Sequence, residues 1–324
     1  MCRHLAYVGR SRRASELLTD PPHSLVQQAW APRRQTNGIM NVDGFGLGWY
    51  VADDPQPARH RGVGPVWGDE TFADLARTVR TTALLAAVRS ATEGMAHGRA
   101  AAAPFRSGRW LFSHNGALAG WPGSGVDLVK ELGAERLLRL EAPTDAAVLW
   151  ALTLDRLEQG MPLPEALADV VRRAAEACGG RINLLATDGT TIAATTWGAS
   201  LCWRELDGGV LVASEPHDDR PGWHDVPDGN LLTATAPTAA TAPTAATATA
   251  PTAATTAALA TVPTAAPTSQ DRQLRPESGR QASTFRAETA IMPMRSAGAG
   301  AGAVPGVASL SAPANEIRVT LEPL

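Results

Sequence analysis

Apolar and polar positions alternate in short runs towards both ends of the first 232 residues, and this spacing predicts β-strands. One run, CRHLAYVG, opens the chain. Further strands are expected at Gly46–Val51, Ala83–Arg89, Trp110–Ser113, Ile182–Thr187, Thr191–Thr196, Ala199–Trp203 and Val210–Ala213. Asp-Gly or Gly-Gly pairs separate several of these runs, which predicts hairpins and therefore an antiparallel sheet.

The middle of this region instead repeats its apolar residues every three or four positions, which is typical of helices with one buried face. The clearest such stretch is Pro164–Cys178. A second helix is expected to begin at Thr144, which suits an N-cap and is followed by an acidic residue in the first turn. A third helix is predicted over Val126–Leu140. Strands that flank a block of helices indicate a layered α+β fold rather than alternating βαβ units.

The composition changes abruptly near residue 233. Thr-Ala-Pro repeats, a Gln/Arg/Ser-rich stretch and Ala-Gly repeats fill residues 233–314, and they offer too little bulky apolar surface to offset the entropy of ordering. Glu316–Leu321 again has the pattern of a strand. We therefore expect a globular domain over residues 1–232, a disordered Thr/Ala/Pro/Gly-rich insertion over 233–314, and a strand within 315–324 that returns to the domain. A disordered C-terminal end is the alternative.

The formal net charge of −3 gives no broad basic surface, so small-molecule chemistry is favoured over nucleic-acid binding. No apolar run reaches the roughly 18 residues that a membrane span needs. Three cysteines, Cys2, Cys178 and Cys202, lack any metal-ligand spacing, so neither a metal nor a cofactor is expected and a cytoplasmic location is favoured. No pattern in the sequence indicates an oligomeric state.

Cys2 is the most informative position for chemistry. After removal of Met1, one residue carries both a thiol and a free α-amine. An α-amine has a pKa of about 7.7–8.0, close to what a general base needs near neutral pH, so it can take the proton of the thiol. A cysteine after the initiator methionine is common, however, so its weight depends on other features of the chain.

Three further motifs carry candidate chemistry. Asn115 and Gly116, in FSHNG, follow a predicted strand, where an amide and a backbone N–H can converge on an oxyanion, although Asn-Gly is also the strongest short turn signal. Arg89 and Thr92, in VRSAT, suit a substrate carboxylate, although Arg89 also suits a surface strand end. Asp145, at a helix start, suits an ammonium group and equally a helix N-terminus.

The order of Cys2, RxAT at Arg89–Thr92, HNG at His114–Gly116 and the helix-opening Asp145 resembles that of the class II glutamine amidotransferases of the N-terminal-nucleophile hydrolase superfamily. The resemblance covers roughly residues 2–232 and the final strand. It implies a four-layer αββα sandwich, which agrees with the predicted groups of strands and helices.

The same resemblance implies site roles. Cys2 is expected to be the nucleophile with its own amine as base, while Asn115 and Gly116 form an oxyanion hole. The residues expected to hold a γ-glutamyl group are Arg89 and Thr92 for its α-carboxylate, Asp145 for its α-ammonium, and His114 beside them. We expect His114 to be structural rather than a base, because the amine already fills that role.

More narrowly, MCRHLAYVG, DGFGLGWY, VRSAT, FSHNG and ASEPHDD are similar to the stand-alone amidohydrolases of ergothioneine biosynthesis. That resemblance implies removal of glutamate from γ-glutamyl-hercynylcysteine S-oxide. Hydrolysis is expected rather than ammonia transfer, because nothing after Leu232 has the composition of a synthase domain. A glutaminase-like or other γ-glutamyl amidohydrolase and a catalytically silent binding subunit are the alternatives. Candidates for contact with the rest of the substrate are Trp30, Trp49, Ser214, Glu215 and His217.

Overall fold

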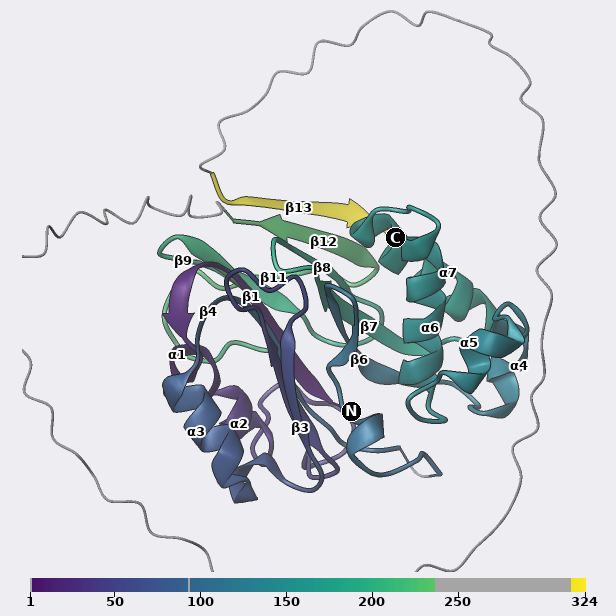
Figure 1. Ribbon diagram of the computed structural model, residues 1–324, viewed down its shortest axis with the longest axis horizontal. Helices are drawn as coiled ribbons and strands as arrows, with labels where there is room; N and C mark the ends of the chain where they lie inside the picture. Colours follow the sequence, from purple (N-terminus) through teal and green to yellow (C-terminus); the bar gives the residue numbers. More distant parts are fainter. Residues whose placement is uncertain (1, 93, 237–315) are drawn as a thin grey trace, which may run out of the picture. The chain divides into compact units, whose positions relative to one another are not determined.

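Two antiparallel sheets pack face to face at the centre of the protein in the computed structural model, which describes residues 2–92, 94–236 and 316–324 (Figure 1). The first sheet has the order β11-β9-β10-β1-β4-β2-β3 and the second β13-β12-β8-β7-β6-β5. The strands of the first sheet are β1 (Arg3–Arg13), β2 (Phe45–Trp49), β3 (Ala58–Gly62), β4 (Arg80–Val88), β9 (Cys202–Leu206), β10 (Gly209–Ala213) and β11 (His224–Asp225). Those of the second are β5 (Phe105–Ser107), β6 (Trp110–Leu118), β7 (Gly180–Thr187), β8 (Thr191–Thr195), β12 (Asn230–Thr235) and β13 (Arg318–Pro323).

Helices cover the outer face of each sheet, so the predicted four-layer αββα arrangement is confirmed (Figure 1). The helices against the first sheet are α1 (Ser15–Leu18), α2 (Leu25–Gln28) and α3 (Glu70–Thr78). Those on the side of the second sheet are α4 (Val126–Lys130), α5 (Ala134–Leu138), α6 (Asp145–Glu158) and α7 (Leu163–Ala177). Short 3₁₀ turns are η1 (Val66–Gly68), η2 (Arg99–Ala101) and η3 (Gly123–Gly125).

The alternation of side chains along β1 explains why this strand lies in the middle of the fold. Leu5 and Tyr7 pack against the helices of the first sheet, whereas Ala6 and Val8 pack into the layer between the two sheets. Successive side chains of a strand point to opposite faces, so a strand buried on both faces needs apolar residues at every position. Residues 5–8 of β1 therefore lie between two apolar layers.

The structure differs from the predicted elements at three places. The strand predicted at Ala199–Trp203 is β9, Cys202–Leu206, because residues 199–201 lie outside any strand. The strand predicted at Trp110–Ser113 continues to Leu118, so the Asn-Gly pair is inside β6 and is not a turn. The helix predicted over Val126–Leu140 is two short helices, α4 and α5, because the chain is extended at Gly133, the N-cap of α5. The other predicted helices are confirmed, and the hydroxyl of Thr144 caps α6 by accepting a hydrogen bond from the N–H of Ala147.

The last described segment forms the edge of the second sheet. Strand β13 pairs antiparallel with β12, with Arg318 opposite Thr235 and Pro323 opposite Asn230. The predicted insertion over 233–314 lies outside the described residues except for its first positions, where β12 continues to Thr235. Within the described residues, none of the helices combines the length and apolarity required to cross a bilayer.

Candidate active site

Cys2 lies immediately before the central strand β1, which runs between β10 and β4. Because Arg3 pairs with Val88 at the end of β4, the segment that follows β4 comes directly beside the cysteine. The thiol of Cys2 is half-buried and donates a weak hydrogen bond to the carbonyl oxygen of Ser90, with Sγ and O 3.9 Å apart. The first two features of the predicted site, Cys2 and the VRSAT motif, therefore meet through strand pairing.

One cleft opens at this point, between the ends of the two sheets and the start of α6. The predicted site residues that line it are Cys2, Arg89, Thr92, His114, Gly116 and Asp145. They come from the residue before β1, from β6, from the start of α6 and from the segment after β4, and they are separated in sequence by up to 143 residues. The tertiary structure therefore brings together six of the seven residues that the sequence suggested, and the seventh, Asn115, is fully buried next to them.

Backbone carbonyls orient the guanidinium of Arg89. Its Nη2 donates to the carbonyl oxygen of Ala96 at 2.9 Å and its Nη1 to that of Asp43 at 3.5 Å. The carboxylate of Asp43 also accepts a hydrogen bond from the N–H of Ala91, at 2.7 Å, which fixes the turn after β4. These contacts use two of the five N–H donors of the guanidinium. Within residues 2–92, 94–236 and 316–324 no carboxylate forms an ion pair with it, so it suits an anionic group in the cleft.

Gly116 is required by close packing rather than by a turn. A Cβ at this position would lie 1.8 Å from the carbonyl oxygen of Arg181 on β7 and 2.8 Å from Nε2 of His114. No side chain fits there, since a Cβ in a real protein essentially never lies within 3.0 Å of another heavy atom of this kind. The Asn-Gly pair therefore marks a point where two backbones approach closely, with the backbone of Gly116 open to the cleft.

His114 and Asp145 form a polar pair on one wall of the cleft, with Nδ1 and Oδ1 4.0 Å apart. Nε2 of His114 lies 3.1 Å from the carbonyl oxygen of Arg181, so Nε2 carries the proton and Nδ1 is an acceptor when the ring is neutral. Asp145 accepts from the N–H of Leu118 at 3.1 Å and from that of Ala146 at 2.7 Å. The start of α6 favours a negative charge here, so this wall presents acceptors to the cleft.

Three further polar residues support the site from behind, and of these only Ser214 was a candidate from the sequence, for contact with the rest of the substrate. Ser214, just after β10, accepts hydrogen bonds at Oγ from the N–H of His4 at 3.0 Å and from Nδ2 of Asn115 at 3.4 Å. Nδ1 of His4 contacts the hydroxyl of Ser113 at 3.1 Å. Burial, with the positive charge of Arg3 adding to it, lowers the pKa of His4 to about 3, so this ring is neutral. The only sequence signal for Ser214 was its place in ASEPHDD.

The candidates for the remainder of the substrate are not cleft residues. None of Trp30, Trp49, Ser214, Glu215 and His217 contributes to the lining among the described residues. Ser214 and Glu215 are instead fully buried.

The other two cysteines lie away from the cleft. Cys178 is half-buried and Cys202 fully buried, and both are free thiols. Within the described residues no group of three or more His, Cys, Asp or Glu side chains is arranged to hold a metal ion.

Comparison with known families agrees with this fold. The family model described as class-II glutamine amidotransferases matches residues 13–206. The chain belongs to this family, an N-terminal-nucleophile type of amide-cleaving enzyme.

Particular relatives are more similar still. The chain is 42% identical over 234 residues to a protein of Mycolicibacterium smegmatis named gamma-glutamyl-hercynylcysteine sulfoxide hydrolase, covering 72% of this chain and 95% of the relative. A protein of the same name from Mycobacterium tuberculosis is 40% identical over 237 residues, covering 72% of this chain and 93% of the relative. Among solved structures, a glutamine aminotransferase class-II domain protein from Silicibacter pomeroyi is 26% identical, with a TM-score of 0.52 over 72% of this chain and 94% of that one.

Proposed function

We propose that this chain hydrolyses the γ-glutamyl amide of γ-glutamyl-hercynylcysteine S-oxide, releasing glutamate and hercynylcysteine S-oxide in ergothioneine biosynthesis. The observation that carries the proposal is the single cleft in which a thiol, a guanidinium and a carboxylate meet, at Cys2, Arg89 and Asp145. The name shared by the two mycobacterial relatives supports this choice of substrate.

The nucleophile is Cys2, and its own α-amine, present once Met1 has been removed, is the base. The amine accepts the thiol proton while Sγ bonds to the γ-carbonyl carbon, which gives a tetrahedral oxyanion. Nδ2 of Asn115 and the N–H of Gly116 donate to that oxyanion. Collapse breaks the C–N bond, and the proton passes from the amine to the leaving nitrogen. Water then attacks the glutamyl thioester, releasing glutamate and returning the proton to sulfur.

The glutamyl group is held at its two charged ends. Arg89 receives the α-carboxylate, and the hydroxyl of Thr92, which is exposed at the cleft, adds a hydrogen bond. The α-ammonium donates to Oδ1 of Asp145 and to Nδ1 of His114, which are separated by 4.0 Å and can share one ammonium group. His114 therefore acts in binding, and its tautomer is set by the bond from Nε2 to the carbonyl of Arg181.

We further propose a cytoplasmic enzyme that acts on a small molecule and binds neither nucleic acid nor membrane. The three free cysteines suit a reducing compartment. The net charge of −3 is unsuited to polyanions.

The test is glutamate release by the purified full-length chain from γ-glutamyl-hercynylcysteine S-oxide, with glutamine and γ-glutamylcysteine assayed in parallel. Much higher kcat/KM for the S-oxide supports the proposed substrate, and equal values for all three indicate a general γ-glutamyl amidohydrolase. No release from any of them indicates a silent binding subunit and overturns the proposal.

Cysteine variants give the matched control. Cys2→Ala deletes the nucleophile and is expected to abolish turnover while leaving substrate binding intact. Cys178→Ala removes another half-buried free thiol, which donates a hydrogen bond to the carbonyl of Ser124, packs at the edge of the core under the second sheet's helices and lies outside the cleft. It is expected to keep wild-type turnover, so a loss common to both variants would argue against a special role for Cys2.

A further inference from the structure

Arg3 is a fully buried cation next to the nucleophile. Its Nε donates to the carbonyl oxygen of Cys2 at 2.7 Å. Its Nη1 and Nη2 have no hydrogen-bond partner among the described residues, and the only carboxylate in an ion pair with it is that of Glu215, 3.7 Å from Nη1. Burial lowers the pKa of Arg3, and the negative charge of Glu215 opposes that effect. The position of Arg3, and through it that of the Cys2 carbonyl, depends on this one counter-charge.

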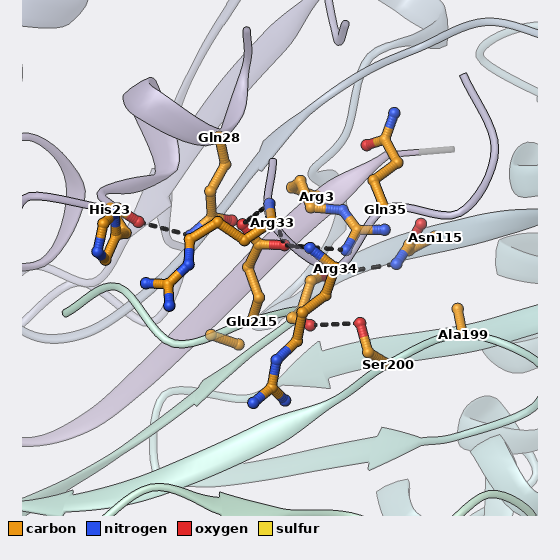
Figure 2. Close-up of polar contacts among 12 residues, drawn as sticks. Arg3, His23, Gln28, Arg33, Arg34, Gln35, Asn115, Ala199, Ser200 and Glu215 are labelled. Carbon is orange, nitrogen blue, oxygen red and sulfur yellow. Dashed lines mark hydrogen bonds and ion pairs between the residues drawn. The ribbon is translucent and has the colours of Figure 1, made fainter. Parts of the chain in front are cut away.

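Glu215 is equally buried, and its other contacts fix it in place (Figure 2). The backbone N–H of Arg33 donates to Oε1 at 2.9 Å and to Oε2 at 3.1 Å, and the N–H of Arg34 donates to Oε2 at 2.7 Å. These backbone donors satisfy both carboxylate oxygens and fix the orientation of the side chain. Figure 2 shows the carboxylate of Glu215 beside the Arg33–Arg34 segment and Arg3.

We propose that Glu215 is a positioning residue for the nucleophile, acting through Arg3 on the backbone of Cys2. This inference rests on the proposed role of Cys2. Glu215 follows Ser214, whose N–H and hydroxyl bind the backbone of His4, so the carboxylate is attached to a segment that is itself fixed to β1. The ion pair then locks the residue before the strand, where no strand pairing holds Cys2.

For this positioning role, the negative charge of Glu215 matters more than the shape of its side chain. Glu215→Gln keeps an oxygen that accepts from the backbone N–H groups of Arg33 and Arg34, but it leaves the guanidinium of Arg3 buried without a counter-charge. A buried cation that loses its partner moves towards water or other acceptors. Because Nε of Arg3 is bonded to the carbonyl of Cys2, that movement shifts the thiol away from its attacking position.

The experiment compares the kinetics of Glu215→Gln with those of the wild type on γ-glutamyl-hercynylcysteine S-oxide. A misplacement of about 1 Å at a reacting group costs about 10²-fold in rate, so we expect kcat to fall about 10-fold to 100-fold. KM is expected to stay unchanged, because Arg89 and Asp145 are not touched. Wild-type kcat in Glu215→Gln would overturn the proposal.

The double variant Arg3→Met/Glu215→Gln separates positioning from stability. It has no uncompensated buried charge, so its melting temperature is expected to recover towards that of the wild type. Its kcat is expected to remain low, because the hydrogen bond from Arg3 to Cys2 is lost. A double variant with wild-type kcat would show that the ion pair only stabilises the fold. If Glu215→Gln alone does not fold, this variant still decides the question.

Asp218→Asn is the matched control. Asp218 lies three residues further along the same segment and also pairs with a buried arginine, Arg204, with Nη1 and Oδ1 2.6 Å apart. None of the recorded bonds of that pair reaches Cys2. This variant is expected to lose stability and to keep kcat, and a comparable loss of kcat in both variants would overturn the proposal.

A second experiment tests the positioning role of Glu215 without using the proposed substrate. The γ-chloroketone analogue of glutamine alkylates the thiol, as an S–C bond forms and chloride leaves, and intact-mass spectrometry follows the adduct at Cys2. We expect the wild type to be labelled at least 10 times faster than Glu215→Gln. Equal labelling rates would overturn the positioning role. A wild type that is labelled but does not hydrolyse the S-oxide would instead overturn only the proposed substrate.

Discussion

The side-chain amide of Asn115 contacts the hydroxyl of Ser214, with Nδ2 and Oγ 3.4 Å apart. The same hydroxyl oxygen accepts the N–H of His4 on β1. Ser214 therefore links the proposed oxyanion hole on β6 to the strand that carries the nucleophile. Both side chains are fully buried, so this contact is protected from competition with bulk water.

Ser214→Ala is expected to lower kcat, by up to about 10²-fold, because Asn115 loses the partner that orients its amide. The steady-state rate of glutamate release measures the effect. Ser200→Ala is the control, since the hydroxyl of Ser200 donates only to the carbonyl oxygen of Ser214 at 2.8 Å. Equal kinetics for the two variants would contradict the orienting role.

Asn115→Ala removes a proposed oxyanion donor, so a larger effect is expected. Loss of one such donor typically lowers kcat by about 10²–10³-fold. KM is expected to change little, because the oxyanion exists only in the transition state. A variant that raises KM and keeps kcat would assign Asn115 to substrate binding instead.

Asp145→Asn is expected to weaken the hold on the α-ammonium of the substrate. A hydrogen bond to a charged group contributes about 1.5–3 kcal/mol, which corresponds to a loss of roughly 10-fold to 100-fold in kcat/KM. The N-cap bond from Ala147 to Thr144 is unaffected. Asp127→Asn, which removes an exposed carboxylate in the first turn of α4, is the control and should keep wild-type kinetics. Unchanged kcat/KM in Asp145→Asn would exclude the ammonium role.

The buried imidazole of His4 predicts a loss of stability in mild acid. Burial and the charge of Arg3 lower the pKa of His4 to about 3, from 6.5 in the unfolded chain. Between those values the unfolded chain binds a proton that the folded protein does not. The stabilisation is therefore complete above pH 6.5 and is lost as the pH falls towards 3, by about 1.4 kcal/mol per pH unit.

Denaturant unfolding at several pH values between 6.5 and 4.5 measures this slope. The variant His4→Gln has no imidazole at this position, so its free energy of unfolding should fall less steeply than that of the wild type. The other titrating groups are common to both proteins and cancel in the comparison. Parallel curves would show that His4 does not contribute.

We propose that residues 233–314 are an insertion between two strands that pair with each other. Thr235 on β12 lies opposite Arg318 on β13, which are the ends that a hairpin connection joins. Replacing residues 237–315 by a short Asn-Gly turn is therefore expected to keep the fold and activity. Melting temperature and kcat test this prediction.

Deletion of residues 316–324 is the comparison. It should lower the melting temperature because β12 loses its neighbouring strand β13. A soluble, fully active product of that deletion would show that β13 is dispensable.

Local patterns predicted the elements that bury one regular face. Helices α6 and α7 have apolar residues at helical spacing because one side of each packs on the second sheet. Strands β3 and β5 were not predicted, since β3 (Ala58–Gly62) is largely polar and β5 has only three residues. Helices α1 to α3 were missed as well. Two of them have only four residues, and such lengths carry no periodicity.

The Asn-Gly pair has a local conformation that its two residue types do not predict. Asn-Gly is typical of a turn, yet Asn115 pairs with Asn183 and Gly116 with Ile182 inside a strand. The glycine is needed because the backbone of Arg181 lies too close for any side chain. That neighbour is 65 residues away in sequence, so no local pattern carries the information.

The sequence by itself determined the layered class of fold, the family and the identity of the residues now seen around one cleft, because residue types and their order are properties of the chain alone. The tertiary structure decided how those residues are held. The counter-charge that Glu215 gives to Arg3 and the contact of Ser214 with Asn115 join segments up to about 210 residues apart. Such contacts arise only when strand pairing and burial bring distant polar groups together where water cannot replace them.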